Sequence, residues 1–226
     1  MGRRRDNVLR MKTRFLHAPV LAAAALLALV AAAFPDPPAQ PHQSQTSTET
    51  VVLAGGCFWG MEAVFESLRG VQNAVSGYAG GNAATAHYEI VSTGTTGHAE
   101  SVEITFDPSK ISFGELLKVY FSVAHDPTQL NYQGPDEGTQ YRSAIFYTTP
   151  EQKELAESYI RELTAAKVFR HPIVTQVVPL RGFYPAEAYH QHFMQKNPNY
   201  PYIVYNDRPK LEALKRTYPS LVKPGT

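Results

Sequence analysis

One short segment surrounds the only cysteine of this 226-residue chain and constrains how the chain can fold. Residues 50–54 are β-branched or apolar, a composition typical of a buried strand. Across residues 58–68, apolar side chains recur three or four positions apart, which is the spacing of one helix face. The two glycines at 55–56 suit the tight turn that must join these elements. The segment therefore predicts a strand, a turn and a helix, with Cys57 in the first helical turn.

The first 33 residues have the organisation of a secretory signal peptide. Six basic residues lie among the first 14, an alanine- and leucine-rich run follows, and Ala31-Ala32-Ala33 offers a small-residue cleavage site. Met11 opens a shorter version of the same pattern and is an alternative start. An uncleaved membrane anchor is the other interpretation, because about 20 apolar residues span a bilayer. We therefore expect an exported protein, periplasmic or secreted, or one that its leader anchors in the membrane.

The rest of the chain fits a linker followed by one domain. Residues 34–49 are rich in Pro, Gln, Ser and Thr, and residues 50–226 are long enough for a single catalytic domain with a sizeable core. Six of the 21 basic and one of the 20 acidic residues precede residue 34, which leaves 15 basic against 19 acidic residues and a net charge of −4. This balance does not indicate nucleic-acid binding. We expect a monomer.

Cys57 has two possible roles. The positive end of a helix dipole favours a thiolate, as in many reactive cysteines. An inert cysteine packed beside core aromatic residues is also common, and the surrounding segment leaves both roles open. In an exported chain, however, a lone cysteine cannot form an internal disulfide, so it pairs with another molecule or remains a reactive thiol. This argument favours a chemical role.

Strand and helix patterns alternate along the domain. Besides the first strand, strands are predicted over residues 70–79, 102–106, 142–148 and 173–178. Besides the first helix, helices are predicted after the capping signals Ser112–Glu115 and Thr149–Gln152, and over residues 185–196. The tail from residue 197 to residue 226 is predicted to be mostly irregular, with a possible helix over 210–216. The order of elements indicates an α/β or α+β fold, with a sheet of split-βαβ type covered by helices.

Several residue combinations suggest alternative chemistries. His98-x-Glu100 matches part of a zinc-deaminase signature, but that site also needs paired cysteines, which the sequence lacks. His190 and His192 lie too close in sequence for a helical pair of zinc ligands. A cysteine hydrolase needs a histidine base beside the thiol, and the candidates are His87, His98, His125, His171, His190 and His192. The sequence leaves this last alternative open.

Five motifs, in the same order, resemble the A-type peptide methionine sulfoxide reductases. The first is Gly55-Gly56-Cys57-Phe58-Trp59-Gly60, around the lone cysteine. The others are Gly77-Tyr78-Ala79-Gly80-Gly81 with Tyr88 downstream, Gly97-His98-Ala99-Glu100, the stretch from His125-Asp126-Pro127 through Gly138-Thr139-Gln140-Tyr141-Arg142-Ser143, and Phe183-Tyr184-x-Ala186-Glu187-x-Tyr189-His190-Gln191. Together they cover about residues 50–200. Five ordered motifs are far more specific than one.

The resemblance implies a ferredoxin-like mixed α/β fold and reduction of the S epimer of methionine sulfoxide, free or in proteins. Carried over by motif, Cys57 would be the nucleophile and Glu100 the proton donor. Sulfoxide sulfur is electrophilic only when its oxygen is neutralised, so a protonated acid must lie beside that oxygen. A glutamate in an aromatic, poorly hydrated pocket has a raised pKa and keeps its proton near neutral pH.

The same resemblance assigns the remaining site residues. Tyr88 and Tyr141 would hydrogen-bond the sulfoxide oxygen as its negative charge develops. Phe58 and Trp59 would form an aromatic pocket for the substrate's ε-methyl group. Asp136 would help to hold the backbone of the substrate.

The chain departs from many members of this family because it has no second cysteine. In those members further cysteines, often near the C-terminus, resolve the sulfenic acid as a disulfide, whereas residues 197–226 contain none. The resemblance therefore implies a one-cysteine enzyme whose sulfenic acid is reduced by an external thiol, such as thioredoxin, glutaredoxin with glutathione, or a periplasmic donor. No metal or organic cofactor is implied. A catalytically inactive module that binds oxidised methionine is a third interpretation, against which the intact Cys57 and Glu100 argue.

Overall fold

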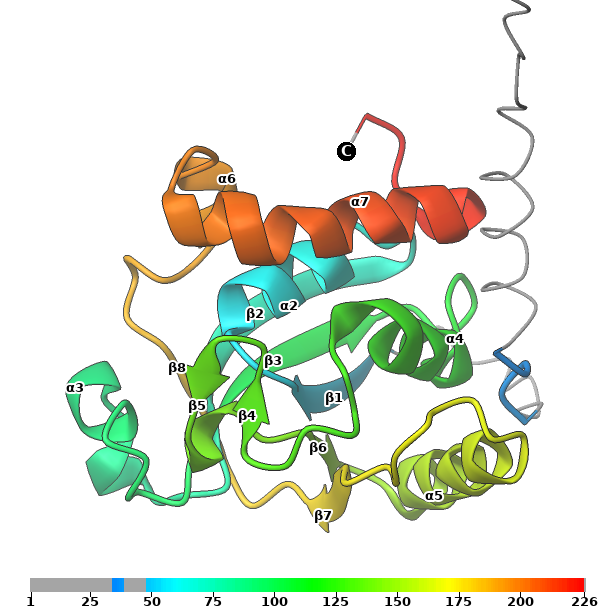
Figure 1. Ribbon diagram of the computed structural model, residues 1–226, viewed down its shortest axis with the longest axis horizontal. Coiled ribbons are helices and arrows are strands. Elements are labelled where there is room, and N and C mark those ends of the chain that lie inside the picture. The colour runs from blue at the N-terminus through cyan, green and yellow to red at the C-terminus, as the bar shows by residue number, and fades with distance from the viewer. Residues whose placement is uncertain (1–33, 39–47, 226) are drawn as a thin grey trace, which may run out of the picture.

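A mixed β-sheet organises the protein (Figure 1). Its strands are β1 (Glu49–Ala54), β2 (Val71–Ala79), β3 (Ala99–Phe106), β6 (Ala144–Tyr147), β7 (Gln176–Pro179) and β8 (Phe183–Pro185). The computed structural model describes residues 34–38 and 48–225, and within them the six strands lie in the order β7-β6-β1-β3-β2-β8. β6 and β7 pair in parallel, and the other neighbours pair antiparallel. A separate hairpin pairs β4 (Tyr132–Gln133) with β5 (Asp136–Glu137).

Helices surround this sheet. They are α2 (Phe58–Glu66), α3 (Tyr88–Val91), α4 (Phe113–Val119), α5 (Pro150–Ala165), α6 (Phe193–Lys196) and α7 (Arg208–Thr217). Two π-helical turns, η2 (Tyr120–Ala124) and η4 (Ile203–Asp207), extend α4 and lead into α7. Short 3₁₀ turns are η1 (Ala83–Thr85), η3 (Thr139–Tyr141) and η5 (Pro219–Leu221). α2 rests on β2 and β3, and α7 lies along α2 (Figure 1).

The central strand β1 shows how the sheet divides the core. Val51 and Leu53 are fully buried and point into the main hydrophobic cluster with the helices. Val52 and Ala54 are equally buried but belong to a smaller cluster on the opposite side. Because side chains alternate along a strand, this division follows directly from an uninterrupted apolar segment that is covered on both faces.

The structure confirms the mixed α/β fold class and most of the predicted elements. β1, β2, β3, β6 and β7 overlap the predicted strands, and α2, α4 and α5 occupy the predicted helices. The capping box before α4 is complete, because Ser112 accepts from the amide of Glu115 and the Glu115 carboxylate accepts from Ser112. At α5, the side chain of Thr149 accepts a hydrogen bond from the backbone N–H of Gln152. The side-chain amide of Gln152 bonds to Thr148 and Thr50 and not to Thr149, so only half of the capping box forms.

The helix predicted over residues 185–196 is largely wrong. Residues 183–185 form the edge strand β8, paired with β2, and helix α6 begins only at Phe193. The side-chain amide of Gln191 explains the difference. It accepts from the backbone N–H of Ser76 at 3.1 Å and donates to the carbonyl of the same residue at 2.8 Å. This bidentate contact continues the edge pairing of β2 in place of a helix.

The tail is more regular than predicted. A helix over 210–216 is confirmed, but α7 is longer, and η4 joins it without a break. Pro209 lies in the first turn of α7, where its missing N–H costs no hydrogen bond. The tail therefore forms a packed layer over α2, not an irregular extension.

A short N-terminal segment packs against the domain within the predicted linker. Phe34 stacks edge-on against Phe169, with ring centroids 5.8 Å apart. The carbonyl of Pro35 accepts a 2.9 Å hydrogen bond from Tyr159, and Asp36 forms an ion pair with Lys118. The leader predicted for residues 1–33 lies outside the described residues. In the described ranges, no helix is both long and apolar enough to span a bilayer.

Candidate active site

A tight turn after β1 presents Cys57 at the start of α2. Gly56 has a φ of +91°, a conformation that favours glycine, and an added Cβ there would lie 2.6 Å from the side chain of Gln133. An added Cβ at Gly55 would lie 2.7 Å from the ring of His125. Cys57 then occupies the N-cap position of α2. The two glycines are therefore required by close packing on both sides of the turn.

A cavity of about 180 Å³ opens at this turn. All seven residues that the sequence singled out line it, together with two tyrosines from the tail. The lining residues are Cys57, Phe58, Trp59, Tyr88, Glu100, Asp136, Tyr141, Tyr200 and Tyr202. They come from the start of α2, from α3, β3, β5 and η3, and from the segment that leads into η4. The fold thus brings together residues that lie up to 145 positions apart in the sequence, from Cys57 to Tyr202.

Glu100 is a buried carboxyl group at the start of β3. Its side chain is 3% exposed, and its Oε2 atom accepts a 3.1 Å hydrogen bond from the backbone N–H of Phe58. Burial raises the pKa of Glu100 to about 8, and the carboxylates of Asp136 and Asp207 add to this shift, whereas the Phe58 amide opposes it. The carboxyl group is therefore protonated at neutral pH.

Cys57 is also buried, and its environment does not favour a thiolate. Burial raises the pKa of the thiol well above its ordinary value, and the charges of Glu100 and Asp207 raise it further. The backbone amide of Trp59 and the charge of Lys210 lower the pKa, but by less. The expectation that the helix N-terminus promotes a thiolate is therefore wrong, because burial outweighs it.

Tyr88 and Tyr141 supply two phenol groups to the cavity. Burial raises the pKa of Tyr88 to about 12 and also raises the pKa of Tyr141, so both remain protonated hydrogen-bond donors. Glu187 fixes the backbone of Tyr88, because its Oε1 atom accepts from the Tyr88 N–H at 2.9 Å. The Oε2 atom of Glu187 accepts from the hydroxyl of Tyr78, a buried β2 residue, at 2.8 Å. One carboxylate thus ties Tyr88 to the sheet.

Phe58 and Trp59 form an aromatic wall that other aromatic side chains hold in place. The indole of Trp59 stacks on Phe193, with centroids 3.8 Å apart and an interplanar angle of 10°. Its N–H donates to Nδ1 of His190 at 3.1 Å. Tyr202 meets the same indole edge-on at 5.9 Å. The wall is therefore rigid and largely apolar.

Asp136 lines the cavity from the β4–β5 hairpin. Its carboxylate accepts a short hydrogen bond from the hydroxyl of Tyr202. Burial raises the pKa of Asp136, while Tyr202 and Lys210 lower it. The hairpin and the tail thus meet across the cavity.

The histidines do not form a base for Cys57. Both ring nitrogens of His125 are engaged, with Tyr120 and Ser143, and burial lowers its pKa to about 3. Nδ1 of His190 accepts from Trp59. Within residues 34–38 and 48–225, no hydrogen bond joins Cys57 to a histidine. The described part of the chain likewise holds no cluster of three or more residues suited to a metal ion.

Five residues shape the site in ways that the sequence did not predict; of these, only His190 had been considered, as a candidate base or zinc ligand. Glu187 and His190 belong to the last family-like motif, and their hydrogen bonds to Tyr88 and Trp59 are visible only in the folded protein. The remaining three are aromatic residues of the last third of the chain, namely Phe193, Tyr200 and Tyr202. The sequence does show that the tail is rich in aromatic residues, and this could have indicated that the tail packs against the aromatic Phe58-Trp59 pair.

Comparisons with known proteins agree with this geometry. The family described as "Peptide methionine sulfoxide reductase" matches residues 49–221. The peptide methionine sulfoxide reductase MsrA 2 of Mesorhizobium japonicum is 60% identical over 180 residues, which are 80% of this chain and 92% of that protein. The protein of the same name from Synechocystis is 53% identical over 192 residues, 84% of this chain and 90% of that protein.

Two solved structures are also similar. The reduced form of Mxr1 from Saccharomyces cerevisiae has a TM-score of 0.65 and 32% identity, and the match covers 70% of this chain and 91% of that one. Methionine sulfoxide reductase A of Corynebacterium diphtheriae has a TM-score of 0.58 and 39% identity, covering 74% and 84%. The family match spans the whole sheet, the cavity and α7. The chain therefore belongs to the peptide methionine sulfoxide reductase family.

Proposed function

We propose that this methionine sulfoxide reductase acts on the S epimer of methionine sulfoxide, with Cys57 as the nucleophile and Glu100 as the proton donor. Family membership establishes the reaction as reduction of methionine sulfoxide, an oxidoreductase activity that repairs oxidised proteins. The observation that carries the assignment of roles is the convergence of a thiol, a protonated carboxyl group and two phenols on one aromatic cavity. These are the groups that reduction of a sulfoxide requires.

The reaction begins at the sulfoxide oxygen. Glu100 gives its proton to this oxygen, which makes the substrate sulfur electrophilic, and the sulfur of Cys57 bonds to it. The protonated oxygen then bonds to the sulfur of Cys57 as its bond to the substrate sulfur and the new sulfur–sulfur bond both break, so the thioether leaves and Cys57 becomes a sulfenic acid. The proton lost by the thiol replaces the one that Glu100 gave up. One thiol and one sulfoxide thus become one sulfenic acid and one thioether.

Tyr88 and Tyr141 assist by donating to the oxygen while its charge develops. Their raised pKa values keep both phenols protonated, so they act as donors and not as bases. Phe58 and Trp59 receive the ε-methyl group, because a rigid aromatic wall favours a methyl group over the charged or larger alternatives. Donors on one side and an apolar wall on the other distinguish the two epimers at sulfur. Asp136 accepts from the backbone amide of the substrate.

The sulfenic acid needs a thiol from another molecule. Cys57 is the only cysteine of the sequence, so no second thiol of this chain can form a disulfide with it. We assign the second half of the cycle to an external donor: a thioredoxin-like protein, glutaredoxin with glutathione, or a periplasmic thiol donor. Residues 1–33 support export as a signal peptide or anchor, and the reductant would then belong to that compartment. We further propose that the protein acts as a monomer.

The test is turnover of each sulfoxide epimer by the purified protein. With dithiothreitol as reductant, the S epimer of a methionine sulfoxide peptide is reduced and the R epimer is not. Cys57→Ser abolishes the activity, because a hydroxyl cannot form the sulfenic acid. Glu100→Gln removes most of it, because an amide does not deliver the proton. Persistence of the S epimer in the presence of the wild-type protein would refute the proposal.

The recycling step is tested by omitting the reductant. Without any thiol, the wild-type protein converts at most one sulfoxide per Cys57 and then stops, with a sulfenic acid that dimedone labels. A panel of thiol donors identifies the one that restores turnover. Repeated turnover without an added thiol would contradict the one-cysteine cycle.

A further inference from the structure

Asp207 is a fully buried carboxylate that the reaction above does not use. It ends the π-helical turn η4 and has no exposed surface. Its Oδ1 atom accepts from Nζ of Lys210 at 3.1 Å, one helical turn further along in α7. Among the described residues, its Oδ2 atom has no hydrogen-bond partner. A buried carboxyl group with only one of its two oxygens bonded lowers the stability of the fold, which points to a role beyond packing.

Asp207 lies directly against the first turn of α2. A Cβ added to Gly60 would be 2.2 Å from its Oδ1 atom and 2.6 Å from its Cγ atom. Gly60 follows Cys57 by three positions, which is one helical turn. α7 as a whole packs along α2, which holds the carboxylate in this place (Figure 1). The last glycine of the Gly55–Gly60 motif thus provides the space that Asp207 fills.

The pair also influences the charges in the cavity. In its ionised form Asp207 raises the pKa of Cys57 and of Glu100, and Lys210 lowers the pKa of Cys57. Burial raises the pKa of Asp207 itself, and Lys210 opposes this shift by stabilising the ionised form. Other ionisable groups line the cavity with Cys57: Glu100 from β3, Asp136 from β5, Tyr88 from α3, Tyr141 from η3, and Tyr200 and Tyr202 from the segment that leads into η4. Among the groups that act on the thiol in the described residues, Lys210 is the cation. Cys57, Glu100 and Asp207 are buried, so salt screens the interactions among these three groups only weakly.

We propose that Asp207 and Lys210 form a positioning pair, carried by the C-terminal η4–α7 unit, that sets the ionisation of Cys57 from the face of α2 against which this unit packs. Lys210 favours the thiolate, and Asp207 favours the thiol and keeps the proton on Glu100. Because Lys210 is hydrogen-bonded to Asp207, the two opposite charges act on Cys57 together. Asp207 keeps the resting thiol protonated and thus slow to react with oxidants, and Lys210 stabilises the thiolate that forms during attack. This inference rests on the proposed role of Cys57 and adds that two residues of the C-terminal tail set the ionisation of its thiol.

The test is the rate at which iodoacetamide alkylates Cys57 in the full chain as a function of pH, since only the thiolate reacts. Asp207→Asn keeps the shape but removes the negative charge, so alkylation below the thiol pKa becomes about tenfold faster, a shift of about one pKa unit. Lys210→Gln removes the cation, and alkylation becomes severalfold slower. The double variant returns towards the wild-type profile, because both charges are gone.

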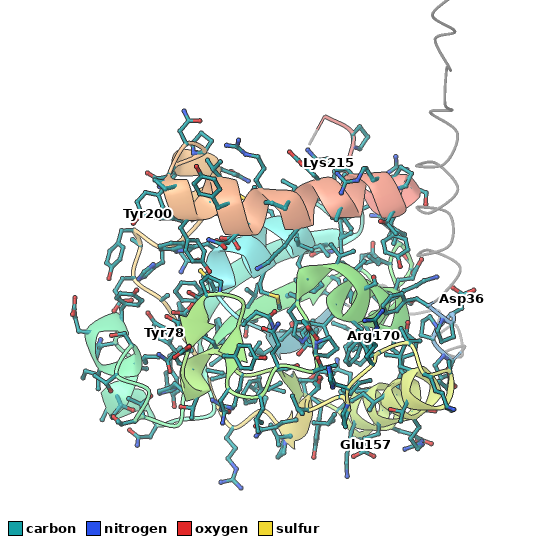
Figure 2. The ribbon with its side chains drawn as sticks, viewed as in Figure 1. Asp36, Tyr78, Glu157, Arg170, Tyr200 and Lys215 are labelled. Atoms are coloured by element: carbon teal, nitrogen blue, oxygen red, sulfur yellow. The ribbon has the colours of Figure 1, made fainter. Side chains whose placement is uncertain are left out.

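Lys215→Gln is the matched control. Lys215 is an exposed residue of the same helix (Figure 2), and the substitution makes the same change of charge without touching Asp207. Its alkylation profile is unchanged. Cys57→Ser takes up no label, which confirms that the measured thiol is Cys57.

The opposite signs separate an electrostatic role from a merely structural one. The proposal would be overturned if Asp207→Asn and Lys210→Gln shifted the pH profile of alkylation in the same direction. It would also be overturned if both left the profile unchanged and lowered the melting temperature, because the pair would then only hold α7 against α2. If Asp207→Asn does not fold, the slower alkylation of Lys210→Gln, measured against Lys215→Gln, decides alone. The measurement uses no sulfoxide, so it stands apart from any failure of the proposed function.

Discussion

The backbone N–H of Phe58 donates a 3.1 Å hydrogen bond to the Oε2 atom of Glu100. An N–H donates to an oxygen that carries no proton, so the proton of the neutral carboxyl group belongs on Oε1. Phe58, which follows the proposed nucleophile, therefore fixes both the place of the proposed acid and the oxygen from which it would donate. This contact joins the start of α2 to β3 across 42 positions of the sequence.

The first prediction concerns the pH dependence of sulfoxide reduction. Because the proposed mechanism needs a protonated Glu100 and the pKa of this residue is about 8, we expect single-turnover rates of the reduced wild-type protein to fall as pH rises through about 8. Glu100→Gln is slower by about 10²–10⁴-fold and lacks this decline. The measurement uses stoichiometric protein without free thiol, so that ionisation of the reductant does not contribute. A decline near pH 8 that survives in Glu100→Gln would assign it to another group.

A second prediction concerns stability and the same residue. The folded-state pKa of Glu100 lies above its ordinary value of 4.5, so the unfolded chain loses the proton first as pH rises. The free energy of unfolding therefore decreases progressively as pH rises from about 4.5 to about 8, and Glu100 causes no such loss below pH 4.5. Glu100→Gln removes this loss and raises the melting temperature most at pH 8 and least at pH 4.5. An equal gain at both pH values would contradict this account.

A third prediction concerns Glu187, which holds Tyr88 through its backbone. Glu187→Gln replaces one acceptor oxygen by a donor NH₂ group, so one of the two hydrogen bonds at this side chain is lost. We expect about a tenfold loss of kcat/KM, because a phenol displaced by a fraction of an ångström stabilises the oxygen poorly. Glu89→Gln, on the exposed side of α3, is the control and retains full activity.

A double variant shows whether Glu187 acts through Tyr88. If it does, Glu187→Gln added to Tyr88→Phe costs little beyond Tyr88→Phe alone. Fully additive losses would show that Glu187 supports the site by another route, such as its bond to Tyr78.

A fourth prediction concerns the space at Gly60. Gly60→Ala places a methyl group within 2.2 Å of the Asp207 carboxylate, which is buried and cannot move into solvent. We expect a loss of about 1–3 kcal/mol in the free energy of unfolding, measured by urea denaturation. The loss is smaller when the same substitution is made in an Asp207→Ala background, because the clashing group is gone. An equal loss in both backgrounds would place the strain elsewhere.

The sequence predicted the parts of the fold whose signal is local. The apolar run of β1, the period of α2 and the Ser112 cap each depend on neighbouring residues, and all three are present. The region 185–196 was assigned wrongly because its conformation depends on a distant partner. Gln191 bonds to the edge of β2, which lies 115 positions away, and no local pattern encodes such a contact.

The candidate site divides in the same way. The seven residues carried over from family motifs line one cavity, because each lies near a point where a helix, strand or turn begins or ends at that cavity. The ionisation of Cys57 was assigned wrongly, since the helix terminus is visible in the sequence and the burial is not. Tyr202 and Asp207 escaped notice because their partners, Asp136 and Gly60, lie far away along the chain.

The docked segment at residues 34–38 has a practical consequence. Asp36 lies at one end of the molecule, and Tyr200, an exposed residue that lines the cavity, lies near the other end (Figure 2). Phe34 and Pro35 fasten this segment to α5 and the loop after it. A resin, electrode or fusion partner attached ahead of Phe34 would therefore leave the cavity free. The protein is suited to use as an immobilised repair catalyst over which oxidised proteins can be passed.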